Sequence, residues 1–315
     1  MRRSDKLIVA VVALAIALVG AFYLVIHRPR PAPGADSGPL PTTPGHYFGV
    51  AEADEIKSYT PIENFAAAVG REPNVVLYYS AWGDPFEKRL ALNAQAHGAI
   101  PFVQIIPGPH VTMAAVAAGK YDSYLRSYAN EVRYYVDPVI VGFAPEMNGN
   151  WDSWGWHHTK PSVWIAAWRH VVTLFRDQHA RNVTWLWTVN ASSNGTGRLQ
   201  QWWPGGAYVT WVGIDGYYFY QASTFTSTFD PTIDAIHALT DKPILLSETG
   251  IGQVAGQAKK IPDLFDGVRA ARVLGFVWFD QNQDELPYHQ RWRLETNPAG
   301  LAVFRRELAT SGGDL

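Results

Sequence analysis

The hydrophobic pattern of the chain changes character along its length. Residues 7–26 form a run of twenty positions without a charged side chain, and residues 28–45 have no apolar period but hold six prolines and three glycines. After that, short β-branched or aromatic runs alternate with longer amphipathic stretches. These patterns predict a membrane segment at 1–27, a linker at 28–45 and one folded domain at 46–315.

Twenty apolar residues are enough for an α-helix to cross the roughly 30 Å hydrocarbon core of a membrane. Arg2, Arg3 and Lys6 precede the run, which favours a cytoplasmic N-terminus and an extracellular domain. We expect an uncleaved single-pass anchor in the cell membrane, because the run exceeds the roughly 7 to 15 residues of a signal-peptide core. A cleaved signal peptide ending near Ala21 is the alternative, and it would give a secreted protein. The proline-rich linker predicts a semi-rigid spacer.

Eight short runs in the domain are predicted to be β-strands, since they are rich in β-branched and aromatic residues. They occupy residues 47–53, 74–82, 100–107, 139–145, 183–189, 210–218, 243–249 and 275–281. Helical patterns lie between or after them at 85–98, 121–135, 161–179, 231–240, 261–275 and 299–310. Pro161 and Pro231 stand where a first helical turn tolerates proline, and Gly98 and Gly275 stand just past the ends of predicted helices.

Eight near-continuously apolar strands that alternate with helices over roughly 260 residues indicate a parallel (β/α)8 barrel, the TIM-barrel fold. An open doubly wound sheet is the alternative. It is disfavoured because no glycine-rich nucleotide-binding turn follows the first strand.

Composition narrows the function classes. The formal net charge is −2 and no stripe of Lys and Arg is present, which argues against a nucleic-acid partner. The chain has no cysteine, so neither a disulfide nor a thiol nucleophile is available. Aromatic residues make up 13% of the chain, and the exposed part of them would suit stacking on sugar rings. The sequence has no HExxH-type spacing, so we expect no catalytic metal. We also expect a monomer without a cofactor.

In a (β/α)8 barrel, functional groups gather at the carboxyl ends of the strands. The fourth predicted strand ends just before Glu146, and the seventh ends around Glu248. These glutamates are 102 residues apart, about three strand–helix units, so both should reach the same rim. A lone glutamate at a strand end more often forms a salt bridge or a cap. Two of them on one rim favour glycoside hydrolysis, which uses one carboxylic acid and one carboxylate.

Four sequence strings carry a resemblance to a known family. PEMNGNWDSWG, YVTWVGIDGYY, LLSETG and WFDQNQD occur in this order and resemble glycoside hydrolase family 26, whose members are retaining (β/α)8 enzymes. The resemblance covers residues 47–315. It implies activity on β-1,4-mannan, or less often on β-1,3-xylan or mixed-linkage β-glucan.

The resemblance also assigns roles. It implies Glu146 as the acid/base and Glu248 as the nucleophile. It places Trp151 at the cleavage site, Trp278 under the sugar at subsite −1, and Tyr217 in a hydrogen bond to the nucleophile, with Tyr218 as a competitor for that hydrogen bond. The family commonly reads Arg-Pro-x-His-Glu at the acid, whereas this chain has Gly142, Phe143, Ala144 and Pro145 before Glu146. A change of sugar specificity, or of catalytic efficiency, is therefore expected.

Three further residues are candidates for sugar binding. Trp154 would form a second wall beside the acid. Trp82, at the end of the second strand, would either hold a distal sugar or close the top of the barrel. Asn190, at the end of the fifth strand, would bind a sugar hydroxyl or anchor a buried hydrogen bond.

The sequence therefore predicts a membrane-tethered extracellular endo-glycosidase that hydrolyses a β-linked polysaccharide with retention. β-Mannan is the first candidate substrate, and β-glucan and β-xylan are the others. A carbohydrate-binding or cell-envelope protein on a decayed glycosidase scaffold is the alternative from a different functional class.

Overall fold

The structure, a computed structural model, describes residues 38–53, 57–192, 195–252, 255–283 and 290–315. The predicted membrane segment and the first ten linker residues lie outside these ranges. Within the described residues, no helix has both the length and the apolar character needed to cross a bilayer.

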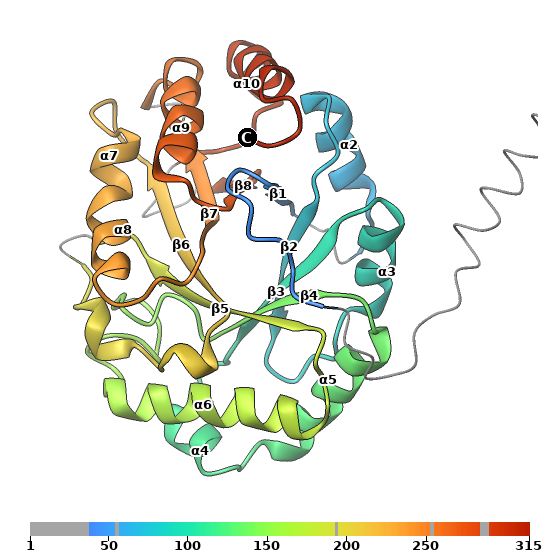
Figure 1. Cartoon of the computed structure of the whole chain (residues 1–315), viewed down its shortest axis with the longest axis vertical. Coiled ribbons are helices and arrows are strands. Elements are labelled where there is room, and N and C mark those ends of the chain that lie inside the picture. The colour runs from blue at the N-terminus through green and yellow to red at the C-terminus, as the bar shows by residue number, and fades with distance from the viewer. Residues whose placement is uncertain (1–37, 54–56, 193–194, 253–254, 284–289) are drawn as a thin grey trace, which may run out of the picture.

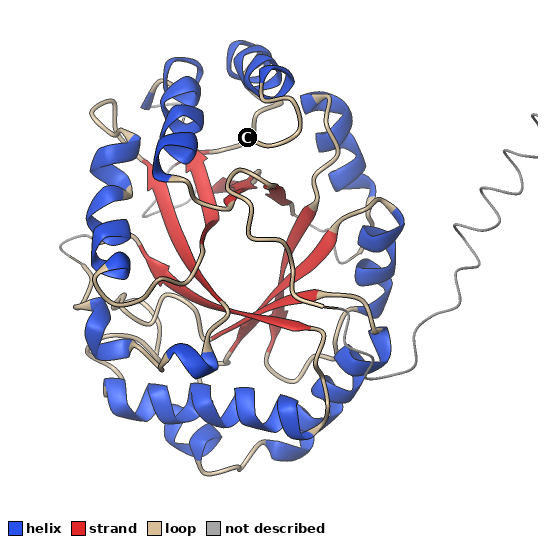
Figure 2. Cartoon of the chain, viewed as in Figure 1, coloured by secondary structure: helices blue, strands red, loops and turns tan. Residues whose placement is uncertain are grey.

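Eight parallel strands close into a barrel in sequence order, and helices surround it (Figures 1 and 2). The predicted (β/α)8 barrel is confirmed, and each predicted strand overlaps an observed one. The strands are β1 (Tyr47–Ala51), β2 (Val75–Ala81), β3 (Ile100–Ile106), β4 (Val139–Phe143), β5 (Val183–Asn190), β6 (Trp211–Tyr218), β7 (Ile244–Ile251) and β8 (Gly275–Phe279). Closure is made by β1 and β8, where Tyr47 pairs with Gly275 and Ala51 with Phe279.

The helices between the strands are α2 (Thr60–Val69), α3 (Lys88–Ala96), α4 (Met113–Ala117), α5 (Asp122–Tyr135), α6 (Pro161–Asp177), α7 (Phe225–Thr228), α8 (Asp230–His237), α9 (Gln257–Ala271) and α10 (Pro298–Thr310). Two 3-10 turns, η1 (Leu199–Trp202) and η2 (Gly206–Tyr208), follow β5, and a short ribbon of β9 (Asn282–Gln283) and β10 (Gln290–Arg291) follows β8. The hydrophobic pattern does not predict α2, α4 or α7. The predicted start of α9 at residue 261 is too late, because Pro262 lies inside the helix rather than in its first turn.

The prediction that Gly275 directly follows a helix end is wrong. Arg272, with φ of 52°, is the left-handed residue that caps α9. Gly275 instead begins β8 with φ of 140°, and a Cβ at this position would lie 1.8 Å from the Tyr47 carbonyl oxygen. Glycine is needed here because β1 and β8 approach closely where the barrel closes.

Alternate residues of each strand face different layers. One buried cluster consists mainly of strand residues such as Tyr47, Val75, Phe102, Leu245 and Val277, and it fills the barrel interior. The other cluster joins the remaining strand residues to the helices and packs the outer layer. This alternation decides which strand-end side chains reach the mouth of the barrel.

Candidate active site

A cavity of about 720 Å³ lies at the carboxyl ends of the strands. Side chains that follow or end β2, β4, β5, β6, β7 and β8 contribute to its wall. The lining includes Tyr79, Pro145, Glu146, Trp151, Asp152, Trp154, Asn190, Asp215, Tyr217, Phe219, Tyr220, Glu248, Phe279 and Gln283. The structure therefore brings the two predicted glutamates to one cavity.

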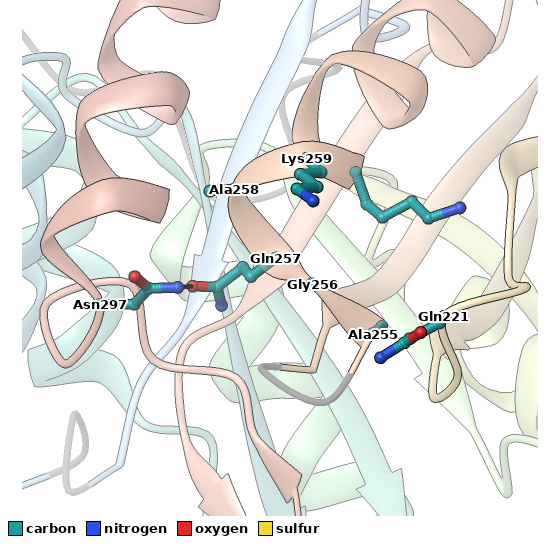
Figure 3. Close-up of a pocket in the computed structure, with 8 residues that line it drawn as sticks. Gln221, Ala255, Gly256, Gln257, Ala258, Lys259 and Asn297 are labelled. Atoms are coloured by element: carbon teal, nitrogen blue, oxygen red, sulfur yellow. Dashed lines mark hydrogen bonds between the residues drawn. The ribbon is translucent and has the colours of Figure 1, made fainter.

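A second cavity, of about 420 Å³, lies beside the start of α9 (Figure 3). Gln257 and Asn297 in its wall form a hydrogen bond of 2.9 Å with each other, and Gln257 also donates to the Ile251 and Trp292 carbonyl oxygens. These contacts join α9 to the segments around it, so Gln257 and Asn297 stabilise the fold.

The backbone that carries Glu146 is unusual for non-glycine residues. Ala144 and Glu146 have φ angles of 44° and 53°, in the left-handed region. The Glu146 N–H donates to the Thr188 carbonyl oxygen at 3.0 Å, and Trp154 Nε1 donates to the Pro145 carbonyl oxygen at 2.8 Å. These bonds from β5 and from the following loop hold the strained turn, which is a common way for a fold to aim a functional side chain.

The Glu146 carboxyl group is held by two donors. Asn190 Nδ2 donates to Oε1, and Trp151 Nε1 donates to Oε2 at 3.0 Å. Burial, together with the negative charge of Glu248, raises the pKa of Glu146 to about 8, although the two hydrogen bonds act to lower it. Glu146 is therefore protonated at neutral pH, which suits a general acid.

Glu248 lies in β7 and accepts hydrogen bonds from two tyrosines. Tyr79 Oη donates to Oε1 at 2.5 Å, and Tyr217 Oη donates to Oε2 at 2.6 Å. Burial raises the pKa of Glu248, and both tyrosine hydrogen bonds act in the opposite direction by stabilising the carboxylate. This pair of donors favours an ionised Glu248 beside a protonated Glu146.

A third carboxyl group, that of Asp215, lines the same cavity. Asp215 lies between Asn190 and Glu248 in the pairing of β5, β6 and β7, and it accepts a hydrogen bond of 2.6 Å from Ser247 Oγ. Burial, followed by the negative charges of Glu248 and Glu146, raises its pKa well above the ordinary range. The neutral form of Asp215 is therefore favoured while Glu248 is ionised.

Four of the predicted sugar-binding residues line the cavity. Trp151 is 45% exposed, so its ring is open to a ligand while its Nε1 holds Glu146. Tyr217 is the tyrosine on Glu248, whereas the competitor Tyr218 donates to Asp263 instead, at 2.8 Å. Asn190 contacts the acid. Trp154 is only 4% exposed, and its hydrogen bond stabilises the turn at Glu146. It therefore supports the backbone of the site more than it offers a surface to a sugar.

Trp278 requires a correction, because the structure places it outside the cavity. It has no exposed surface, and its ring packs edge-on against Phe304 of α10 with the centroids 5.1 Å apart. In β8 it alternates with Val277 and Phe279, which face the barrel interior. Phe279, the next residue, lines the cavity where Trp278 was expected.

Trp82 also lies outside the cavity lining. Its ring packs against Tyr121 and Tyr124, with centroid separations of 5.3 and 5.0 Å. Of the two roles predicted for it, this geometry favours packing over the binding of a distal sugar.

The departure from the family string has a structural reason at Gly142. A Cβ at this position would lie 1.9 Å from Gln104 Oε1, so an arginine would fit here only if the Gln104 side chain moved. Gln104 fills that space from β3 and donates to Thr188 Oγ1 at 2.8 Å. At the position of the family histidine, Pro145 gives the cavity an apolar wall.

Sequence reasoning missed Tyr79 and Phe279. Tyr79 lies in the YY pair of the second predicted strand, and alternation puts one of two consecutive residues towards the barrel interior. That rule could have identified a second tyrosine at the barrel mouth, and it could have favoured Phe279 over Trp278.

Comparison with known proteins also indicates a glycoside hydrolase. The model of the glycosyl hydrolase family 26 matches residues 118–305. Endoglucanase H of Acetivibrio thermocellus is 26% identical over 275 residues, which cover 82% of this chain and 30% of that protein. β-1,3-Xylanase TXYA of a Vibrio species is 30% identical over 101 residues, which cover 31% of this chain and 21% of that protein. The chain thus spans less than a third of either relative.

Solved structures agree on the fold. An endo-β-1,4-mannanase double mutant of Cellulomonas fimi superposes with a TM-score of 0.67 at 17% identity, covering 86% of this chain and 72% of that one. The catalytic domain of a family 26 endo-β-1,4-mannanase from Bacillus sp. JAMB-750 gives 0.64 at 17% identity, covering 84% and 85%. With the family match over more than half of its length, the chain belongs to glycosyl hydrolase family 26.

Proposed function

We propose that the protein is a retaining endo-glycosidase that hydrolyses internal bonds of a β-linked polysaccharide. One observation carries the proposal. Two glutamates line one open cavity in different surroundings: the pKa of Glu146 is raised to about 8, whereas two tyrosine hydroxyls donate to Glu248 and oppose the rise that burial causes in its pKa. That is the division of labour required for two-carboxylate glycoside hydrolysis.

In the first step, Glu248 attacks the anomeric carbon while the Glu146 carboxyl group gives its proton to the departing glycosidic oxygen. A glycosyl ester of Glu248 forms, and the leaving sugar departs as an alcohol. In the second step, Glu146 takes a proton from water, whose oxygen attacks the anomeric carbon and frees Glu248. The negative charge of Glu248 is one cause of the raised pKa of Glu146, and esterification removes that charge. The pKa of Glu146 then falls, as a general base requires.

An open, aromatic cavity rim supports action on a polymer. Trp151 and Tyr220 are 45% and 71% exposed, and both line the cavity. Their rings offer flat apolar faces for sugar rings. These exposed rings would let a polysaccharide extend across the site in both directions, as cleavage at internal bonds requires.

β-Mannan remains the first candidate substrate, as the family resemblance implies. β-Glucan is a second candidate because the relative that covers 82% of the chain is described as an endoglucanase. Pro145, in place of the family histidine, gives a physical reason for a different preference at the cleavage site.

The test is a panel of β-mannan, glucomannan, lichenan, β-1,3-xylan and β-1,4-xylan incubated with the purified full chain and with Glu248→Gln as the control. New reducing ends in the wild-type reactions alone, with oligosaccharides as the first products, would support the proposal. Proton NMR of the first product should show the β-anomer before mutarotation. Binding without any product on every substrate would instead favour the decayed-scaffold alternative.

We also propose that residues 7–26 anchor the protein and that the domain faces the outside of the cell. The uncharged run and the preceding Arg2, Arg3 and Lys6 support this orientation. In fractionated cells, the protein should remain in carbonate-washed membranes and be cleaved by protease added to intact spheroplasts. Recovery of full-length protein in the soluble cytoplasmic fraction would refute the proposal.

A further inference from the structure

Three acidic side chains meet at the barrel rim but do not line the active-site cavity. Glu52 follows β1, Asp280 follows β8, and Glu295 lies between β10 and α10. Each offers a carboxylate oxygen, and these oxygens lie within 4.8 Å of one another. The Asp280 N–H donates to the Ala51 carbonyl oxygen at 2.9 Å, so the pairing of β1 and β8 fixes the first two residues beside each other.

The oxygens of this cluster are buried and incompletely bonded. Glu52 is 1% exposed and Asp280 has no exposed surface. Among the described residues, four buried carboxylate oxygens accept no hydrogen bond: Oε1 and Oε2 of Glu52, Oδ2 of Asp280 and Oε2 of Glu295. A buried carboxylate oxygen without a donor is costly, so a further positive partner would be a direct physical explanation.

Arg293 supplies only part of the counter-charge. Its guanidinium nitrogens lie 3.7 Å from Glu52, 3.6 Å from Asp280 and 3.3 Å from Glu295. Arg293 is the basic side chain that the described residues place beside the three carboxylates, so the cluster keeps a formal charge of −2 when all three are ionised.

We propose that Glu52, Asp280 and Glu295 bind one structural divalent cation, Ca²⁺ in preference to Mg²⁺. All offered ligands are oxygens, which select a hard cation, and a charge of +2 balances the site. Ca²⁺ accepts oxygens at 2.3–2.6 Å in irregular arrangements, so ligands on opposite sides of it are up to about 5 Å apart. That spacing matches the spread of the cluster, whereas Mg²⁺ demands a tighter octahedron.

The position of the site gives the cation a role in the fold. Trp292, next to Arg293, packs its ring on Tyr217 with centroids 4.9 Å apart and donates to Gln283 Oε1 at 3.0 Å. A cation shared by Glu52, Asp280 and Glu295 would fasten this segment to β1 and β8. It would stabilise the wall behind Tyr217 without taking part in the reaction.

The test uses the full chain in non-ionic detergent, stripped with EDTA and dialysed into metal-free buffer. Isothermal titration calorimetry and thermal unfolding are measured with CaCl₂ and with MgCl₂. A ligand that binds only the folded state at 100 times its Kd raises the folded-to-unfolded ratio about 100-fold, so Ca²⁺ should raise Tm by several degrees. Mg²⁺ should give a smaller shift.

Glu52→Gln and Glu295→Gln keep the side-chain volume and should abolish the Ca²⁺ titration and the Tm shift. Glu72→Gln, at an acid with 60% side-chain exposure, is the matched control and should retain both. If Glu52→Gln does not fold, the wild-type titration and the Glu295→Gln variant still test whether the cluster binds Ca²⁺. Absence of any saturable Ca²⁺ effect on the stripped wild type would overturn the proposal and leave shared protons to neutralise the cluster. An equal Ca²⁺ effect in the Glu295→Gln variant would overturn it as well.

Discussion

Tyr217 and Tyr218 are consecutive residues of β6 whose hydroxyl groups bind different carboxylates. Tyr217 Oη donates to Glu248 Oε2 at 2.6 Å, on the cavity side of the barrel, and Tyr218 Oη donates to Asp263 Oδ2 of α9 at 2.8 Å, in the outer layer. The strand alternation thus divides two chemically identical residues between the cavity and the outer layer. Tyr79 of β2 joins Tyr217 on the cavity side, so Glu248 is held from two strands.

Tyr79→Phe and Tyr217→Phe should each lower kcat roughly 10- to 100-fold, because each removes a hydrogen bond to a charged group worth about 1.5–3 kcal/mol. Both hydrogen bonds lower the pKa of Glu248, so their loss should move the acidic limb of the pH–rate profile to higher pH. Tyr218→Phe is the control, and it should reduce Tm while leaving that limb in place. The same shift of the acidic limb in all three variants would contradict this division of roles.

Much of the fold follows from local pattern. The eight apolar strand runs predict the barrel, because parallel strands covered on both faces are apolar along their length. The short helices α4 and α7 escaped notice since four or five residues are too few for a clear helical period. The start of α9 is predicted too late because proline usually marks a first helical turn, whereas Pro262 lies inside the helix.

The site is predictable only in part. Glu146 and Glu248 are found from strand counting, since both lie at strand ends on one rim. Trp278 was misplaced because a motif gives the order of residues but not the face towards which each points. Alternation brings one tyrosine of the YY pair to the barrel mouth, but its contact with Glu248, across 169 residues of sequence, follows only from the fold.

Glu146→Gln and Glu248→Gln should separate the two proposed roles. Glu248→Gln removes the nucleophile, so turnover should fall by several orders of magnitude on every substrate. Glu146→Gln removes the proton donor, so the loss should be large on polysaccharide but small for formation of the glycosyl-enzyme from an aryl glycoside with an acidic phenol, which leaves without protonation. Burst kinetics with a dinitrophenyl glycoside measure this step. Equal loss in both variants on the activated substrate would contradict the assignment.

The pH dependence follows from the protonation states. The first step needs Glu146 protonated and Glu248 ionised, so kcat/KM should fall on the alkaline side with an apparent pKa near 8 and on the acidic side as Glu248 takes up a proton. Because the two carboxyl groups interact, the limbs belong to the pair. A profile that stays flat from pH 6 to pH 10 would exclude Glu146 as the acid.

Glu146 should also make the stability of the protein fall as the pH rises, in parallel with the alkaline loss of activity. Its folded-state pKa is raised above the value of an exposed glutamate, so its contribution to stability is fully present below pH 4.5 and is lost as the pH rises through about 8. Glu146→Gln cannot ionise, and it should therefore gain roughly 1 kcal/mol or more over the wild type at pH 9, relative to pH 4.5. Urea unfolding at both pH values measures the difference. If the difference in free energy of unfolding between the wild type and the variant is the same at both pH values, Glu146 is not buried as a neutral acid.

Trp151 and Trp278 should respond differently to the same substitution. Trp151→Phe removes the donor to Glu146 Oε2 and part of an exposed ring, so KM should rise several-fold and the alkaline limb should move to higher pH, because that hydrogen bond lowers the pKa of Glu146. Trp278→Phe removes buried ring atoms beside Phe304 and the 3.1 Å hydrogen bond to Asp280, so it should cost about 1–3 kcal/mol of stability with KM unchanged. Steady-state kinetics and thermal unfolding of both variants measure these effects. A raised KM with an unchanged Tm in Trp278→Phe would restore Trp278 to the sugar site.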